Sequence, residues 1–162
     1  MASGDTLLTL HAMGASVTLT TDATFDTRNE QICLDFDAAA DETARFTAIL
    51  PKSYGGGGIN VIVHAAMTTA VTGDVVVTAE IERQAGLDLD TDSFAAAQTA
   101  TVTVPATAGQ EFTITIGFTN GAQMDSLAVG EQFRLRVTRD ANAAGDTAAG
   151  DMELYTVEIR EQ

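Results

Sequence analysis

The chain has 162 residues, which is enough for one domain with a substantial hydrophobic core. It carries 23 acidic and 8 basic residues, a formal net charge of −15, with no basic run that could follow a phosphate backbone, which excludes nucleic acid as a partner. No segment approaches the ~20 apolar residues that cross a bilayer, so we expect no membrane contact, and the single cysteine, Cys33, excludes an internal disulfide.

Residues 1–30 are the least regular part of the sequence. Short alternating runs at 6–11 and 16–21 are typical of brief strands, with Gly14 between them. We therefore predict an N-terminal arm or edge segment over residues 1–30, followed by one β-sandwich domain over residues 31–162.

From residue 31 onward, apolar and polar residues alternate between turn signals, which predicts a succession of β-strands. The predicted strands cover residues 31–36, 43–50, 59–67, 74–83, 100–105, 111–118, 132–139 and 152–160. The run at 59–67 is apolar on both faces, as expected of a central strand or of an oligomer contact. A short turn containing Gly73 joins it to the run at 74–83, so we expect these two strands to form a hairpin.

The clearest alternation lies in the strands at 111–118 and 132–139. One face of these strands carries large apolar side chains, whereas the opposite face carries threonine or arginine, as in an antiparallel sheet with one solvated side. The residues that we expect in the core are Phe112, Ile114, Ile116, Phe118, Phe133, Leu135 and Val137.

Two local features interrupt the strand pattern. Asp92 or Ser93 could cap a helix, and Phe94 with the alanines after it predicts one or two helical turns. In the last strand the inward set changes from Leu154 to Tyr155, which predicts a β-bulge near Leu154. About eight strands and one short helix indicate an all-β fold, an antiparallel, jelly-roll-like β-sandwich, in preference to an immunoglobulin-like one.

An acidic stretch has part of the pattern of a calcium loop. Asp88, Asp90 and Asp92 alternate like the first ligands of such a loop, but Ser93 replaces the sharp-turn glycine and Thr99 replaces the bidentate glutamate. We therefore favour an acidic loop that leads into a helix cap.

Other candidate sites are also incomplete. His64 cannot assemble a three-nitrogen metal site within one chain, because His11 is the only other histidine. The glycines at 55–58 lack the Lys-Ser or Lys-Thr pair and the helix that follow in a phosphate-binding loop. No serine lies in a nucleophile elbow. We expect no cofactor, no structural metal and no enzyme activity.

Three stretches of the sequence resemble small virion structural proteins of tailed bacteriophages. They are DTRN at 26–29, LDFDAAADETARFTAILPKSYGGGG at 34–58 and GAQMDSLAVGEQFRLRVTRDANAAGDTAAGDMELYTVEIR at 121–160. In these proteins a Gly-Glu or Gly-Asp pair, as at 130–131, enters a strand that ends in Arg-Asp, as at 139–140.

The resemblance implies a capsid decoration (cement) protein on the outer shell of a virion, made in the cytoplasm of the bacterial host. It also implies a homotrimer whose partner is the major capsid protein or another virion protein. A tail or fibre location is equally compatible with the resemblance.

A carbohydrate-binding or adhesive module on the same sandwich is the alternative class. Such modules present aromatic side chains to sugar rings, and Tyr54 beside the glycines is the one attractive candidate, because tryptophan is absent. The candidate interface residues are Ile62, His64, Tyr54, Arg134 and Arg136.

Overall fold

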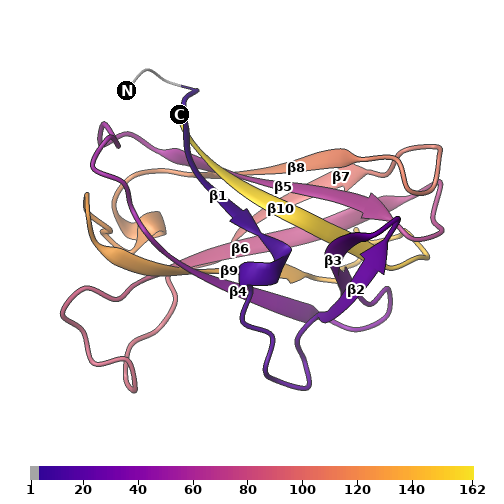
Figure 1. The fold of residues 1–162 in the computed structure, drawn as a ribbon, viewed down its shortest axis with the longest axis horizontal. Coiled ribbons are helices and arrows are strands. Elements are labelled where there is room, and N and C mark those ends of the chain that lie inside the picture. Colours follow the sequence, from indigo (N-terminus) through magenta and orange to yellow (C-terminus); the bar gives the residue numbers. More distant parts are fainter. Residues whose placement is uncertain (1–3) are drawn as a thin grey trace.

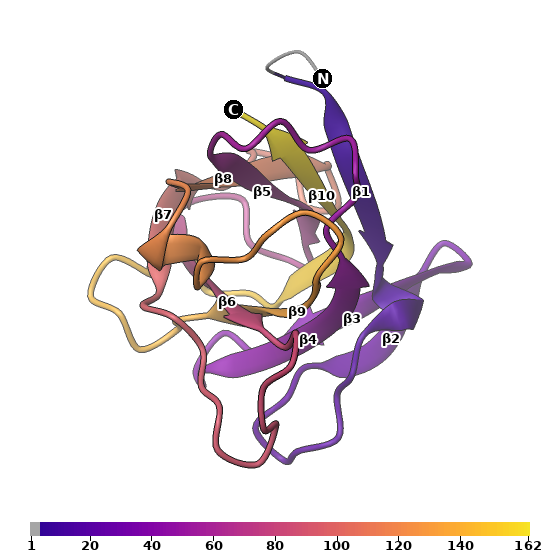
Figure 2. The ribbon, with the colours of Figure 1, turned by 90° about the vertical axis from the view of Figure 1, so that its left-hand side faces the viewer.

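The computed structural model describes residues 4–162, which form two antiparallel β-sheets packed face to face (Figure 1, Figure 2). Sheet A contains β1 (Thr6–His11), β2 (Thr24–Arg28), β3 (Gln31–Phe36), β5 (Ile59–Met67), β8 (Phe112–Phe118) and β10 (Met152–Glu161). Sheet B contains β4 (Glu42–Ile49), β6 (Asp74–Arg83), β7 (Gln98–Thr103) and β9 (Gln132–Arg139). The helical elements of residues 4–162 are two 3-10 turns, η1 (Ala12–Gly14) and η2 (Ala122–Met124), and no helix in this range is long and apolar enough to span a membrane.

The strand order is that of a jelly roll with additions at one edge. Sheet A runs β2-β3-β10-β5-β8, with β1 paired to the second half of β10, and sheet B runs β4-β9-β6-β7. From β3 onward the chain changes sheet at almost every step, so most strands pair with partners that are distant in the sequence. The predicted all-β, jelly-roll-like sandwich is confirmed.

The observed strands follow the predicted ranges closely, but the predicted hairpin of β5 and β6 is wrong. β5 pairs with β10 and β8 in sheet A, whereas β6 pairs with β9 and β7 in sheet B. The segment with Gly73 therefore carries the chain from one sheet to the other. Alternation identifies the buried face of a strand but not its partner, so both arrangements satisfy the same pattern.

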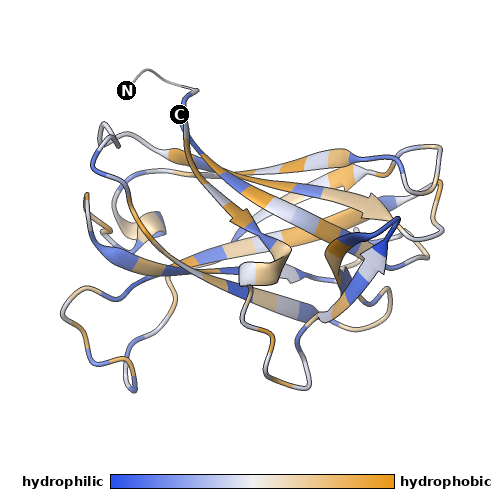
Figure 3. Ribbon diagram, in the orientation of Figure 1, coloured by the Kyte–Doolittle hydropathy of each residue, from blue (hydrophilic) through white to orange (hydrophobic). Residues whose placement is uncertain are grey.

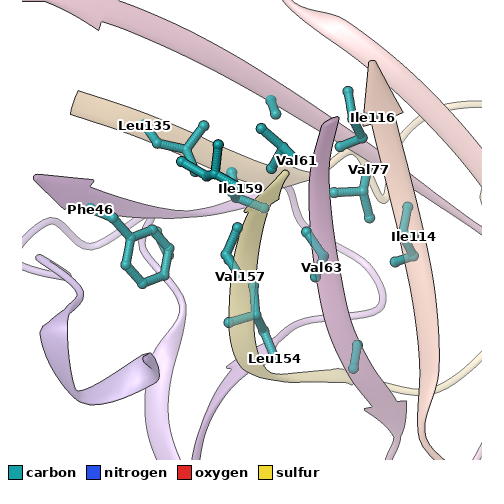
Figure 4. Packing of buried hydrophobic residues seen from close by; sticks show 14 of the residues in the cluster. Phe46, Val61, Val63, Val77, Ile114, Ile116, Leu135, Leu154, Val157 and Ile159 are labelled. Atoms are coloured by element: carbon teal, nitrogen blue, oxygen red, sulfur yellow. The ribbon is translucent and has the colours of Figure 1, made fainter. Parts of the chain in front are cut away.

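The core fills the space between the sheets, and apolar residues alternate with polar ones along the strands (Figure 3). Figure 4 shows Val63 and Ile114 of sheet A close to Val77 of sheet B in this core. Of the residues expected in the core, those fully buried are Ile114, Ile116, Phe118, Phe133, Leu135 and Val137. Phe112 is half-buried against the same cluster. Each buried side chain of this size contributes about 1.5–3 kcal/mol of hydrophobic stabilisation.

The predicted short helix does not form. Phe94 lies in a segment without regular secondary structure, and the next residue, Ala95, donates its backbone N–H to the carbonyl of Ile81 at 2.9 Å. The Phe94 ring packs under the guanidinium groups of Arg134 and Arg136, whose Cζ atoms lie 5.1 and 4.2 Å from the ring centroid. These contacts with sheet B outweigh the weak helical preference of the alanines.

Residues 4–30 lie along the edges of the sandwich. β1 pairs with β10 and packs its inward leucines against the core, and β2 forms a hairpin with β3. The predicted strand at 16–21 is absent, and Ser16 and Asp22 instead each make an isolated bridge to β4. The Asp22 carboxylate explains the difference, because it accepts hydrogen bonds from the backbone N–H groups of Thr18 and Leu19 and closes a loop there.

Candidate functional site

A hollow of about 490 Å³ lies on the face of sheet A that is turned away from sheet B. This volume falls in the range of ordinary small-ligand sites, ~300–1,000 Å³. The β2–β3 hairpin, β5, β10 and the segment before β8 all contribute to its lining. We call it the sheet A hollow, and its main polar and aromatic side chains are Arg28, Asn29, Gln31, His64, Glu111 and Tyr155.

The β2–β3 hairpin forms one wall of the hollow by bending over sheet A. In a flat sheet β2 would lie three strands from β5, or about 14 Å. Arg28 Nη2 nevertheless lies 3.2 Å from the carbonyl oxygen of Thr68, the residue that follows β5. In Figure 1 the hairpin tip is drawn over the arrowhead of β5. The tip is a two-residue turn in which Asn29 and Glu30 have φ of 48° and 68°, the signs of a type I′ turn.

Three acceptors bind the Arg28 guanidinium through two of its nitrogen atoms. Its Nε donates to Glu153 Oε2 at 2.5 Å, and its Nη2 reaches the carbonyl oxygens of Met67 and Thr68. The Glu153 side chain is only 4% exposed, so its carboxylate is shielded from water, whereas the Arg28 side chain is 34% exposed. Arg28 Nη1 makes no hydrogen bond within residues 4–162 and remains available to a ligand in the hollow.

The ring of Tyr155 provides the aromatic surface of the hollow. The register of β10 shifts between Leu154 and Thr156, which confirms the predicted bulge. The expected inward direction of Tyr155 is wrong, because the bulge places this side chain in the hollow on the outer face. Its hydroxyl donates to Glu153 Oε2 at 2.9 Å. Burial, and then the hydrogen bond to Glu153, raise the pKa of the Tyr155 phenol, so the hydroxyl stays protonated.

His64 and Glu111 form the opposite side of the hollow. His64 projects from the outer face of β5, and its Nδ1 lies 2.8 Å from Glu111 Oε1. Its Nε2 lies 3.8 Å from Glu158 Oε2. A hydrogen bond from Arg160 lowers the pKa of Glu158, so that carboxylate stays charged. The side chain of Glu111 is 59% exposed, which leaves it free to accept hydrogen bonds from a ligand.

Tyr54, the aromatic residue expected to meet a sugar, is not in this hollow. It is 6% exposed and belongs to the hydrophobic core. Its hydroxyl donates to the carbonyl oxygen of Gly57 and lies 3.7 Å from Met124 Sδ. The glycine-rich loop thus folds back over the ring, and Tyr54 can neither stack on a sugar nor form an interface.

The other candidate interface residues have diverse environments. His64 lies in the hollow, whereas Ile62, two residues earlier on the same face of β5, is 6% exposed. Arg134 and Arg136 are already paired: Arg136 makes two hydrogen bonds to Glu80 at 2.5 and 2.6 Å, and Arg134 binds the buried carboxylate of Glu82 in the same way. Both arginines stabilise sheet B and are not free cations for a partner.

Within the predicted acidic loop, Asp88 makes a local hydrogen bond that shapes a turn. The Oδ1 atom of Asp88 accepts the backbone N–H of Asp90 at 3.1 Å, in an exposed turn. In the part of the chain that the structure describes, no group of three or more His, Cys, Asp or Glu side chains is placed to hold a metal ion.

Arg28, Gln31 and Glu111 line the hollow but were not among the candidate residues predicted from the sequence. A signal for the first two is present, because Asn29–Glu30 is a two-residue turn between the alternating runs TFDTR and QICLDF. That pattern predicts a hairpin, but it does not predict that the hairpin bends over the sheet.

Solved structures with a similar fold include carbohydrate-binding modules. The chain is similar to the CBM22-1 xylan-binding domain of Paenibacillus barcinonensis Xyn10C, with a TM-score of 0.54 and 14% identity over 99% of this chain and 97% of that chain. For the CBM22-2 xylan-binding domain of the same protein the TM-score is 0.56, at 14% identity over 96% and 99% of the two chains. The chain shares the β-sandwich fold of these modules.

A third similar structure contains a bound sugar. The CBM22-1–GH10 part of Clostridium thermocellum xylanase 10B, solved with xylohexaose, has a TM-score of 0.53 and 16% identity over 98% of this chain and 29% of that chain. At these identities the likeness concerns the fold alone. The sequence matches no protein-family model and no curated protein.

Proposed function

We propose that this protein is a non-catalytic carbohydrate-binding module whose binding site is the sheet A hollow. The observation that carries the proposal is the grouping of prepositioned polar side chains around the half-buried ring of Tyr155. A sugar presents hydroxyl groups, which both donate and accept hydrogen bonds, and an apolar ring face. The hollow offers a hydrogen-bond donor in Arg28, an acceptor in Glu111 and an aromatic ring in Tyr155.

The hollow is largely built before a ligand arrives. Glu153 holds both Arg28 and Tyr155, through Oε2 contacts of 2.5 and 2.9 Å, and Glu111 holds His64 at 2.8 Å. Side chains that are already fixed lose little rotational freedom on binding, which otherwise costs about 0.5–1.5 kcal/mol for each side chain. The site therefore suits a weakly interacting, hydroxyl-rich ligand.

The charge of the protein favours a neutral glycan. Each arginine of residues 4–162 already pairs with a carboxylate. The remaining acidic groups give the net charge of −15, which repels sulfated or uronic polysaccharides. We expect the preferred ligands to be uncharged glycans.

Binding to a panel of xylo-, cello-, laminari- and manno-oligosaccharides tests the proposal. We expect Tyr155→Ala to lower the affinity at least about tenfold, because both the ring and the hydroxyl are lost, while Tyr155→Phe keeps part of it. Tyr54→Phe is the matched control, because it changes the other tyrosine, in the core. Wild-type protein that binds no member of the panel, or a folded Tyr155→Ala variant that binds as the wild type does, would contradict the proposal.

Capsid decoration, as a homotrimer bound to the shell, is our second proposal. The observation that favours it is an apolar flank on which Met13, Phe25 and Ile32, which are 65%, 50% and 37% exposed, line a shallow hollow of about 300 Å³. Such a patch is typical of a surface that is covered in an assembly. Co-purification with phage particles, and its loss in Phe25→Ser, test this proposal; a protein that is monomeric and absent from particles contradicts it.

A further inference from the structure

We infer that the sheet A hollow receives the end of a glycan chain and not an internal stretch of it. The inference rests on the proposed function and concerns the shape of the same site. It follows from the contact between the Arg28 side chain and Gly109, which closes one end of the hollow.

The closed end is built from two segments that are far apart in the sequence. Gly109, in the segment before β8, donates its backbone N–H to the carbonyl oxygen of Met67 at 2.9 Å. Arg28, near the tip of the β2–β3 hairpin, donates Nη2 to the same carbonyl at 3.5 Å and to that of Thr68 at 3.2 Å. The hairpin tip and the segment before β8 therefore meet over the end of β5.

The two segments lie in close contact, so a side chain at position 109 would press against the end of the Arg28 side chain. A Cβ atom at position 109 would lie 3.0 Å from Arg28 Nη1 and 3.6 Å from Arg28 Cζ. Gly109 also has φ of +76°, a conformation that other residues rarely adopt. No sugar ring can pass between Arg28 and Gly109, so a glycan chain cannot leave the hollow at this end.

At the other end of the hollow, the described residues show no contact between the β2–β3 hairpin and the segment before β8. This end is bordered by His64 and Thr156, and the His64 side chain is 33% exposed. His11 pairs in register with Thr156 on the neighbouring strand and is exposed to solvent. A glycan chain can extend in this direction while its terminal residue lies against Arg28 and Tyr155. Arg28 Nη1 is then the donor available to the terminal hydroxyl groups.

The stoichiometry of binding to polymers of different length tests the inference. Isothermal titration with xylan, hydroxyethylcellulose, laminarin and glucomannan, each in fractions of different mean length, gives the number of protein molecules bound per chain. We expect this number to stay constant as the chains lengthen, because the number of ends per chain does not change. A number that rises in proportion to chain length overturns the inference and leaves the proposed function intact. Binding to none of the polymers or their oligosaccharides overturns both.

Two matched glycine variants test the closed end itself. Gly109→Ala forces the guanidinium of Arg28 to move, whereas Gly86→Ala imposes a similar backbone strain, at φ of +70°, with nothing within 4 Å of the added Cβ. We expect Gly109→Ala to weaken binding of the best oligosaccharide of the panel about tenfold, as for one lost charge-assisted hydrogen bond, and Gly86→Ala to leave it unchanged.

Arg28→Lys supplies a second readout that does not depend on the glycine. Lysine keeps a positive charge beside Glu153 but cannot reproduce the forked contacts with Met67 and Thr68. The end of the hollow should then open, and the number of molecules bound per chain should begin to rise with chain length. Two results together would contradict the inference. One is a folded Arg28→Lys variant with the wild-type affinity and a constant stoichiometry, and the other is an equal effect of Gly109→Ala and Gly86→Ala on binding.

Discussion

Arg139 at the end of β9 and Asp146 in the loop that follows form a fully buried ion pair. Their side chains are 0% and 1% exposed, and Arg139 Nη2 lies 2.9 Å from Asp146 Oδ1. Arg139 Nε also donates to Asp146 Oδ2 at 3.1 Å, while Nη2 donates to the carbonyl oxygen of Ala148 at 2.9 Å and Nη1 to that of Gly150 at 2.7 Å. The pair therefore fixes the long connection between β9 and β10, the strand that carries Tyr155.

Removing one member of this pair should destabilise the protein strongly. We expect Asp146→Ala to lower the free energy of unfolding by about 3–5 kcal/mol, because it leaves an uncompensated buried guanidinium. The control is Arg160→Ala, which breaks the more exposed pair with Glu158 and should cost less than about 1 kcal/mol. Urea unfolding measures both values, and equal losses in the two variants would contradict the role of the buried pair.

A core substitution in β9 tests the packing of the two sheets. Phe133 is 0% exposed, and we expect Phe133→Ala to cost about 3–5 kcal/mol through lost burial and the cavity left behind. Thr115→Ala, on the exposed side of β8, should change the stability by less than about 0.5 kcal/mol. A loss below about 1 kcal/mol for Phe133→Ala would mean that the faces of β9 are misassigned.

The raised pKa of Asp35 predicts a specific dependence of stability on pH. Burial, and then the charges of Asp151 and Glu153, raise its pKa to about 6 from the ordinary value of 3.8. Because the folded state binds this proton more tightly than the unfolded state, the stabilisation from protonation is complete below about pH 4 and is lost as the pH rises through about 6. The Oδ1 atom is buried without a hydrogen-bond partner in the described chain, which makes the charged form costly.

Asp35→Asn removes the free-energy cost of burying a charged carboxylate at this position. We expect the variant to be more stable than the wild type at pH 7 by roughly 1–3 kcal/mol, and the difference to fall towards zero at pH 4. Unfolding at pH 4, 5, 6 and 7 measures the difference directly. An advantage that is equally large at pH 4 would show that charge is not its cause.

The acidic loop gives a prediction about calcium. Asp88 already accepts the backbone N–H of Asp90, and in the described residues these aspartates do not converge on a common centre. We expect addition of calcium or of a chelator to leave the melting temperature unchanged. A rise of several degrees with calcium that is lost in Asp88→Asn would contradict this expectation.

The two tyrosines illustrate what the sequence could and could not predict. Alternation located β5, β6 and β9 well, because one face of each strand is buried whatever its partner is. It could not pair the strands, so β5 and β6 were expected to form a hairpin although they lie in different sheets. Local patterns also gave the wrong environment for each tyrosine. Glycines beside Tyr54 indicated exposure, whereas apolar neighbours of Tyr155 indicated burial.

Long-range contacts explain both reversals. Tyr54 turns inward because its hydroxyl donates to the carbonyl oxygen of Gly57 and contacts the sulfur of Met124, a residue distant in the sequence. Tyr155 turns outward because β10 bulges where its pairing changes from β3 to β1, and Glu153 then fixes the hydroxyl. The hollow itself depends on the bend of the β2–β3 hairpin over sheet A, which is set by the contacts of Arg28 and by no local pattern.

Mapping the glycan contact on the folded protein tests most directly whether the sheet A hollow binds glycans. ¹⁵N-labelled protein is titrated in turn with xylohexaose, cellohexaose, laminarihexaose and mannohexaose, and the backbone amide shifts are followed by NMR. We expect at least one glycan to shift the amides of residues that line the sheet A hollow, namely Asn29, Gln31, His64, Glu111 and Thr156. The amides of β7, at the far edge of sheet B, should stay unchanged. Shifts clustered elsewhere on the protein, or no shifts with any of the four glycans, would show that the sheet A hollow is not a binding site for these glycans.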